Sequence, residues 1–169
     1  PAMDSYIPCP PIPRVEQHRF RCFLDGAMRT YFICTASENN VTEPVLLGEV
    51  GSAVIQRLDN GDLKPLAVRK STMLLYYKKP FSDSLTYAVE KAAQSAGLLV
   101  IDTSVENEYT RRSAADSAAK AQGCARWQMR LQEREMLAEV PPGEAWLIVD
   151  GSISSRGSRQ AILPDQHVL

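Results

Sequence analysis

The chain has 169 residues, 44% of them hydrophobic, and a formal net charge of -1. This length suits one domain with a sizeable core, and the near-neutral balance excludes a protein that is basic throughout, although a local Lys/Arg stripe can still bind nucleic acid. No apolar run approaches the ~20 residues of a membrane span. Because the four cysteines are widely spaced and only two histidines are present, we expect no zinc site and a reduced, cytoplasmic protein.

The first residues are expected to lie outside the folded domain. PAMDS, at the start of the chain, has the character of a tag remnant. The segment YIPCPPIPR then holds four prolines in nine positions, which is typical of an extended arm that builds no core. We therefore interpret residues 1–19 as tag remnant and proline-rich arm, and residues 20–169 as the domain.

Strand-like runs follow the arm. The predicted strands span 21–25, 29–36 and 44–58, the second rich in aromatic and β-branched residues. Because the connections between them are short, we expect an antiparallel meander. The sequence DNGD at 59–62 predicts a turn, and 64–77 is a further candidate extended segment.

The hydrophobic period then changes from that of strands to that of a helix. Residues 82–96 predict a helix with Ser82 or Ser84 as its N-cap, and Gly97 stands where such a helix stops. LLVID, at 98–102, is typical of a short, fully buried parallel strand.

A long helix is predicted over roughly 108–140, and a second buried strand over 145–150. The order of elements is therefore β-β-β-α-β-α-β. This order predicts an α/β fold with a ribonuclease H-like mixed sheet, in which an antiparallel three-strand meander is followed by α-β-α-β.

Two apolar runs lead into Asp-Gly: CFLDGA at 22–27 and AWLIVDGS at 145–152. One interpretation is a tight turn, because Asp caps its own backbone. The other is metal coordination, because Mn²⁺ and Mg²⁺ prefer carboxylate oxygens and glycine leaves room for a ligand. In the predicted sheet the first strand is central and the later strands pair beside it. Asp25 and Asp150 would then end at one edge, and Asp102 ends the strand LLVID.

The long helix supplies a further acid. At ~100° per residue, Glu133 falls in the middle of the apolar face, whereas Glu135 and Glu139 fall off it. Arg126 is also expected on the inner face. The alternative is that Glu133 and Arg126 lie at the edge of the face and reach water through their long stems. The apolar face comprises Ala118, Ala119, Ala125, Met129, Met136, Leu137 and Val140.

This set of residues resembles the NurA nuclease domain. The similarity rests on Asp25-Gly26-Ala27, on Glu133, and on the motif WLIVDGSI at 146–153, and it covers roughly residues 20–153. The second motif is the more specific one. Ala27 stands where the family usually has Ser, and Ile153 replaces the usual Leu.

The resemblance implies a ribonuclease H-like, Mn²⁺-dependent (or Mg²⁺-dependent) DNA nuclease, acting as a 5′–3′ exonuclease and single-strand endonuclease. Its metal ligands and catalytic residues would be Asp25, Glu133 and Asp150. It also implies a homodimer that works with HerA, a hexameric translocating ATPase, in DNA end processing or anti-phage defence. Members of the family continue past the point where HVL ends this sequence, so we expect the nuclease domain to be incomplete at its C-terminus.

Basic residues near these acids are candidates for contacts with the DNA backbone. For any one of them alone, an ordinary solvated surface charge is the simpler interpretation. The candidates are Arg29, Arg126, Arg130, Arg156 and Arg159.

Three alternatives stay open. A ribonuclease H-like nuclease could use Glu90 and Asp102 instead, although Asp150 is followed by Gly-Ser and Asp102 by Thr-Ser. An actin-like ATPase or sugar kinase shares the topology, but LDGAMRT at 24–30 is a poor phosphate loop because it has one glycine and bulky neighbours. A non-catalytic domain that docks a HerA-type ATPase or forms dimers is the third.

Overall fold

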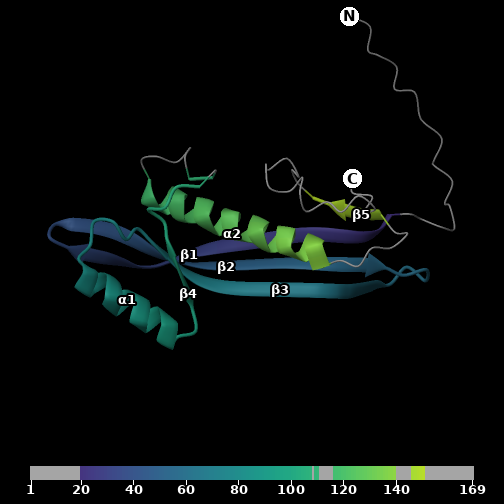
Figure 1. Cartoon of the computed structure of the whole chain (residues 1–169), viewed down its shortest axis with the longest axis horizontal. Helices are drawn as coiled ribbons and strands as arrows, with labels where there is room; N and C mark the ends of the chain where they lie inside the picture. The colour runs from purple at the N-terminus through teal and green to yellow at the C-terminus, as the bar shows by residue number, and fades with distance from the viewer. Residues whose placement is uncertain (1–19, 108, 111–115, 140–145, 151–169) are drawn as a thin grey trace, which may run out of the picture.

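Five strands form one mixed sheet with a helix against each face (Figure 1). The structure is a computed structural model, and it describes residues 20–107, 109–110, 116–139 and 146–150. In chain order the elements are β1 (Phe20–Glu38), β2 (Val41–Arg57), β3 (Leu63–Tyr76), α1 (Asp83–Ser95), β4 (Leu99–Asp102), α2 (Ser117–Glu139) and β5 (Trp146–Val149).

The strand order is β4-β3-β2-β1-β5, so β2 is the central strand. β1, β2 and β3 form the antiparallel meander, while β4 pairs with β3 and β5 pairs with β1, both in parallel. This confirms a mixed α/β fold with the predicted order of elements. The expectation that both later strands lie beside the first is wrong for β4. After α1 the chain returns to the neighbouring strand β3, as consecutive elements commonly do, and Leu99 of this edge strand is half exposed.

β1 runs without a break through Asp25-Gly26, so the prediction of separate strands at 21–25 and 29–36 is wrong. The ladder to β2 continues through the pairs Asp25–Ala53 and Gly26–Ser52. An acid is tolerated inside the strand because the Asp25 side chain is exposed, and its Oδ1 accepts a hydrogen bond of 2.8 Å from the Gly26 N–H. The first Asp-Gly is therefore neither a turn nor a strand end. The predicted extended segment at 64–77 supplies β3 instead.

Local signals for turns and caps are confirmed. The DNGD turn closes with the Asn60 side chain accepting from the Asp62 N–H at 3.0 Å and with Gly61 at φ 90°. The Oγ of Ser82 caps α1 by accepting from the Leu85 N–H at 3.3 Å. Gly97 ends this helix with φ 71°, a conformation that favours glycine.

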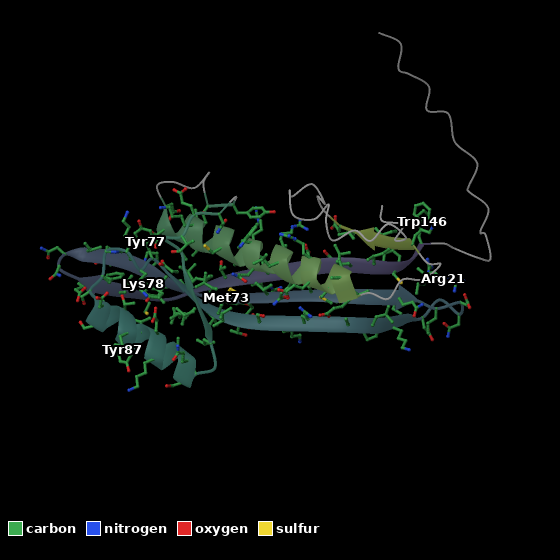
Figure 2. The ribbon with its side chains drawn as sticks, viewed as in Figure 1. Arg21, Met73, Tyr77, Lys78, Tyr87 and Trp146 are labelled. Carbon is green, nitrogen blue, oxygen red and sulfur yellow. The ribbon has the colours of Figure 1, made fainter. Side chains whose placement is uncertain are left out.

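The two helices bury opposite faces of the sheet. α2 covers one face along most of its length, and α1 covers the other face near β3 and β4 (Figure 1). Met73 of β3 lies under α2 (Figure 2), whereas Leu74 and Tyr76 face α1. Among the described residues no helix has the length and apolar character needed to cross a membrane. The apolar side chains of α2 buried at the sheet include Ala121, Cys124, Ala125, Met136 and Leu137.

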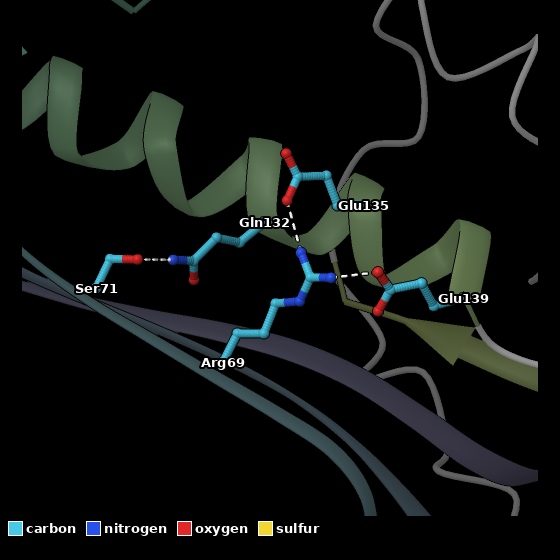
Figure 3. Close-up of polar contacts among 5 residues, drawn as sticks. All are labelled: Arg69, Ser71, Gln132, Glu135 and Glu139. Carbon is cyan, nitrogen blue, oxygen red and sulfur yellow. Dashed lines mark hydrogen bonds and ion pairs between the residues drawn. The ribbon is translucent and has the colours of Figure 1, made fainter.

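Polar contacts fix α2 against β3 (Figure 3). The guanidinium of Arg69 donates to Glu135 at 2.6 Å and also to Glu139, one helical turn further along. Next to it, the Gln132 amide donates to the Ser71 hydroxyl. The two glutamates that the helical period places off the apolar face thus hold the C-terminal half of α2 above the sheet.

Replacing Arg69 with alanine is expected to lower the free energy of unfolding by about 1 kcal/mol. The effect is modest because all three charged groups are partly exposed to solvent, and it should shrink at about 1 M salt. Urea unfolding at low and high salt measures both. Lys70→Ala is the matched control, since Lys70 is the next residue and is exposed. If both variants lost the same amount of stability at low and at high salt, the ion pairs of Arg69 with Glu135 and Glu139 would contribute nothing to stability.

Candidate active site

The carboxyl group of Glu133 lies on the backbone of β1. Glu133 is 4% exposed, as its place in the middle of the apolar helix face predicts. A β-carbon on Gly26 would collide with Glu133 Oε1 and come within 2.8 Å of Met129 Cγ. The first Asp-Gly therefore needs its glycine to make room for Glu133 of the chain itself, rather than for an approaching ligand.

Asp25 and Asp150 lie at neighbouring positions on two paired strands, β1 and β5. In the parallel pair of β1 and β5, Leu24 is in register with Val149, and the Asp150 N–H donates to the Leu24 carbonyl at 3.3 Å. Both acids are exposed. The expectation that Asp25 and Asp150 lie together at one edge of the sheet is confirmed, although Asp25 does not end its strand.

The position of β5 is fixed at its start by an aromatic contact. The ring of Trp146 meets the ring of Phe20 edge-on, with 5.8 Å between centroids. Trp146 and Arg21 lie at the same end of the sheet (Figure 2). Leu147 then inserts into the core beneath Met136 and Leu137. The apolar run before the second Asp-Gly thereby holds Asp150 beside β1.

Arg130 joins the helix acid to the end of β5. Its Nη1 donates to Glu133 Oε2 at 2.7 Å and to the Asp150 main-chain carbonyl at 3.2 Å. The two residues of α2 are three apart, the spacing that brings helical side chains together. That spacing was visible in the sequence, where it would have indicated an ion pair rather than a DNA contact.

Burial raises the pKa of the Glu133 carboxyl above its ordinary value. The hydrogen bond and the positive charge of Arg130 lower that pKa, whereas the negative charges of Asp25 and Asp150 raise it. Asp25 and Asp150 therefore lie close enough to influence Glu133, and Arg130 is the cation that stabilises the ionised form of Glu133.

The present placement of the three acids does not fit a bound metal ion. Their carboxylate oxygens are the donors that Mn²⁺ and Mg²⁺ prefer. However, Gly26 shares the face of α2, so by strand alternation Asp25 belongs to the opposite face. Glu133 is already bound to Arg130. In the part of the chain that the structure describes, no three His, Cys, Asp or Glu side chains are grouped so that they could hold one metal ion.

The buried hydroxyl of Ser52, near these groups, was not predicted from the sequence. Ser52 is in register with Gly26, is 3% exposed, and its Oγ has no hydrogen-bond partner within the described part of the chain. A buried polar atom of this kind is uncommon in proteins. No local sequence signal marks it, because only the pairing of β1 with β2 places Ser52 beside Gly26 under α2.

The predicted DNA-binding arginines are scattered. Arg29 is exposed on β1, and Arg126 is exposed on α2 with its guanidinium 6.0 Å from the Tyr109 ring centroid. The expectation of an inward-facing Arg126 is therefore wrong, because its position on the helix turns the side chain toward this aromatic ring and solvent. Arg130 is bound at the carboxylates, as above. Arg156 and Arg159 lie outside the described residues.

The alternative acids Glu90 and Asp102 lie elsewhere. Asp102 ends β4 at the opposite edge of the sheet from β5, and its Oδ1 accepts from the N–H groups of Lys78 and Ser104 at 3.2 and 2.8 Å. Glu90 of α1 pairs with Lys78 Nζ at 2.9 Å. Lys78 lies far from Trp146 along the sheet (Figure 2). The structure thus brings neither acid to Asp25.

In comparisons with protein-family models and with curated proteins, the chain matches no family model and no curated protein.

Proposed function

We propose that the chain is a DNA nuclease that depends on Mn²⁺ or Mg²⁺ and uses Asp25, Glu133 and Asp150. The observation that supports the proposal is that Asp25 and Asp150, from two adjacent strands, lie close enough to the buried Glu133 of α2 for their charges to raise its pKa. Adjacent parallel strands carry Asp25 and Asp150, and α2 presents the buried Glu133 against Gly26 beside them. A buried carboxyl whose pKa is raised by burial and by neighbouring acids is characteristic of catalytic centres.

A surface that a DNA strand could follow lies on the Asp25 side of the sheet, on the face opposite Glu133. Asp25, Ala27 and Arg29 alternate onto the face of β1 opposite α2, and Asp25 and Arg29 are both exposed. Four residues of strand separate Asp25 from Arg29 by roughly 13 Å. Arg29 is thus placed to bind a backbone phosphate about two to four nucleotides from a phosphodiester near Asp25, given a rise per nucleotide of ~3.4 Å in stacked strands and up to ~7 Å in extended strands.

The side chains at this site can bind the DNA backbone and supply negative charge. Exposed carboxylates at Asp25 and Asp150 would repel a phosphodiester unless a cation neutralises them. A divalent ion, when bound, would supply that charge and an activated water. Arg29 would hold the DNA backbone, and Glu133 would complete the carboxylate set.

The finer features belong to the same proposal. The element order β-β-β-α-β-α-β supports a ribonuclease H-like, NurA-type domain, although β4 pairs with β3 rather than β1. We therefore also propose that the chain has 5′–3′ exonuclease and single-strand endonuclease activity and forms a homodimer. It would act in the cytoplasm with a HerA-type ATPase, in DNA end processing or anti-phage defence.

A nuclease assay with titrated Mn²⁺ tests the proposal. The purified chain is incubated with end-labelled linear duplex and with single-stranded DNA, and products are resolved over time. We expect degradation that rises with Mn²⁺, persists more weakly with Mg²⁺, and stops when a chelator is added. A chain that binds a HerA-type ATPase but leaves both DNAs intact at every Mn²⁺ concentration would favour the non-catalytic docking domain instead.

A further inference from the structure

A row of arginines runs along α2. Arg126, Arg130 and Arg134 are four residues apart, a spacing at which helical side chains are neighbours and like charges repel one another. Arg130 is paired with Glu133. Among the residues that the structure describes, no ion pair involves Arg126 or Arg134. The row therefore carries uncompensated positive charge over roughly 12 Å, at ~1.5 Å of helix per residue.

Two aromatic rings lie beside this row. The ring centroids of Tyr109 and Trp127 are 6.3 Å apart, and the ring planes are inclined by 50°. The Arg126 guanidinium lies 6.0 Å from the Tyr109 ring centroid, within the range of a cation–π contact. The Arg130 guanidinium is also close enough to interact with the Tyr109 side chain. Both rings are partly exposed, so aromatic and cationic groups share one surface of α2.

The backbone that carries the Tyr109 ring is held against α2. The Asn107 side chain accepts hydrogen bonds from the N–H groups of Tyr109 and Thr110, at 2.9 and 3.1 Å, and its amide donates to Cys124 Sγ at 3.5 Å. Gly123 leaves room for this approach, because a β-carbon there would lie 3.1 Å from the Tyr109 carbonyl oxygen. The ring is thus placed before any ligand binds, which lowers the entropic cost of binding.

This combination of groups fits a single strand of nucleic acid. Guanidinium groups bind backbone phosphates, and aromatic rings stack on bases. The faces of the bases are free in a single strand, whereas in a duplex they are stacked on one another. A row of roughly 12 Å matches the phosphates of about three or four nucleotides, at ~3.4 Å each. Carboxylates alone would pair with the arginines but would leave the rings without a partner.

We propose that Arg126, Arg134, Tyr109 and Trp127 form a binding surface for single-stranded nucleic acid on α2. Arg126 and Arg134 bind phosphates, Trp127 stacks on a base, and Tyr109 orients the Arg126 guanidinium. The surface goes beyond the proposed function, because Arg29 lies on the face of the sheet opposite α2. Neither a metal ion nor cleavage takes part in this binding, so it can be measured apart from nuclease activity.

Fluorescence anisotropy of the full chain with labelled oligonucleotides, in the presence of EDTA, tests the proposal. The probes are oligo-dT and oligo-rU of about 20 nucleotides, and a DNA duplex of the same length. We expect at least one single strand to bind about tenfold or more tightly than the duplex, since only free bases can stack on Trp127. The tighter of the two single strands identifies the ligand as DNA or RNA. Duplex binding as tight as that of both single strands would overturn the inference.

The stacking role is tested by Trp127→Ala. This variant should bind the tighter single strand about tenfold more weakly, with an unchanged dependence on salt, because no charge is removed. Tyr87→Ala is the matched control. Tyr87 is an exposed ring on α1 (Figure 2), with the Lys91 Nζ 6.0 Å from its centroid, and its loss should leave the affinity near that of the wild type.

The phosphate contacts are tested by Arg134→Gln. It should weaken binding and reduce the slope of log affinity against log salt concentration by about 0.7, the value for one phosphate contact on a single strand. Lys91→Gln is the matched control and should change neither. If Trp127→Ala fails to fold, Arg126→Gln keeps the test decisive, because the Arg126 side chain is exposed and the same reduction of the slope is expected.

Two further outcomes separate this inference from the nuclease. If the folded variants of Trp127, Arg126 and Arg134 bound the single strands no more weakly than the Tyr87 and Lys91 controls, the inference would be overturned. A chain that binds a single strand in EDTA, with these variants weakened as expected, but cleaves no DNA with Mn²⁺ would support the inference and count against the nuclease.

Discussion

An Asp150→Asn variant is expected to lose Mn²⁺-dependent DNA degradation, by at least about a hundredfold, since even outer partners of a metal site contribute about 10–100-fold. The change removes one negative charge from the three carboxylates and keeps the shape of the side chain. Asp150 is exposed, and its anchoring hydrogen bond to Leu24 comes from the main chain. The fold should therefore survive, with stability changed by less than about 0.5 kcal/mol. Product formation from end-labelled DNA measures the loss, and urea unfolding measures the stability.

Two asparagine variants serve as controls for this result. Asp83→Asn removes another exposed acid, from the first turn of α1, and should leave activity unchanged. Asp102→Asn tests the alternative site at β4. Wild-type activity in Asp150→Asn would remove Asp150 from the site, and loss of activity in Asp102→Asn with intact stability would move the site to the opposite edge of the sheet.

A Gly26→Ala variant is expected to lose about 1–3 kcal/mol of stability, the usual cost of overpacking a core. The new β-carbon would occupy the space of the Glu133 carboxylate and lie 2.8 Å from Met129 Cγ. Glu133 must then move away from Arg130, or α2 must rise from the sheet. Urea unfolding gives the stability loss, and nuclease activity should fall with it because Glu133 is displaced.

Gly51→Ala is the matched control for Gly26→Ala. Gly51 lies on β2, in register with Ala27, and the nearest heavy atom to a β-carbon there is the Arg69 carbonyl oxygen at 3.8 Å, an ordinary contact. This control should be neutral or slightly stabilising, by up to about 1 kcal/mol. The loss in Gly26→Ala should also shrink in a Glu133→Ala background. If the two glycine variants were equally stable, Gly26 would not be needed to make room for the Glu133 side chain on β1.

Much of the local structure could be predicted from the sequence. The turn at Asn60-Gly61, the N-cap at Ser82 and the end of α1 at Gly97 depend on groups within a few residues of each other, and such signals act locally. The inward position of Glu133 was also predictable, because helical spacing places it in line with the buried Met136 and Leu137.

Other features could not be predicted because they depend on partners distant in the chain. The continuity of β1 through Asp25-Gly26 is decided by its ladder with Ala53 and Ser52 of β2, whereas the same dipeptide read alone favours a turn. The inward position expected for Arg126 was wrong for the same kind of reason, since a contact with Tyr109 favours the outward side chain.

The sequence by itself determined the order of elements, the limits of α1 to within a few residues, and the candidate acids at positions 25, 133 and 150, although the long helix α2 begins at Ser117 rather than near residue 108 as predicted. Only the tertiary structure decided that β4 pairs with β3, that β5 brings Asp150 beside Asp25, and that Arg130 neutralises Glu133. The reason is physical. Hydrophobic period and capping are set by neighbouring residues, whereas strand order and buried charge pairs are set by which distant surfaces pack together and leave no charge without a partner.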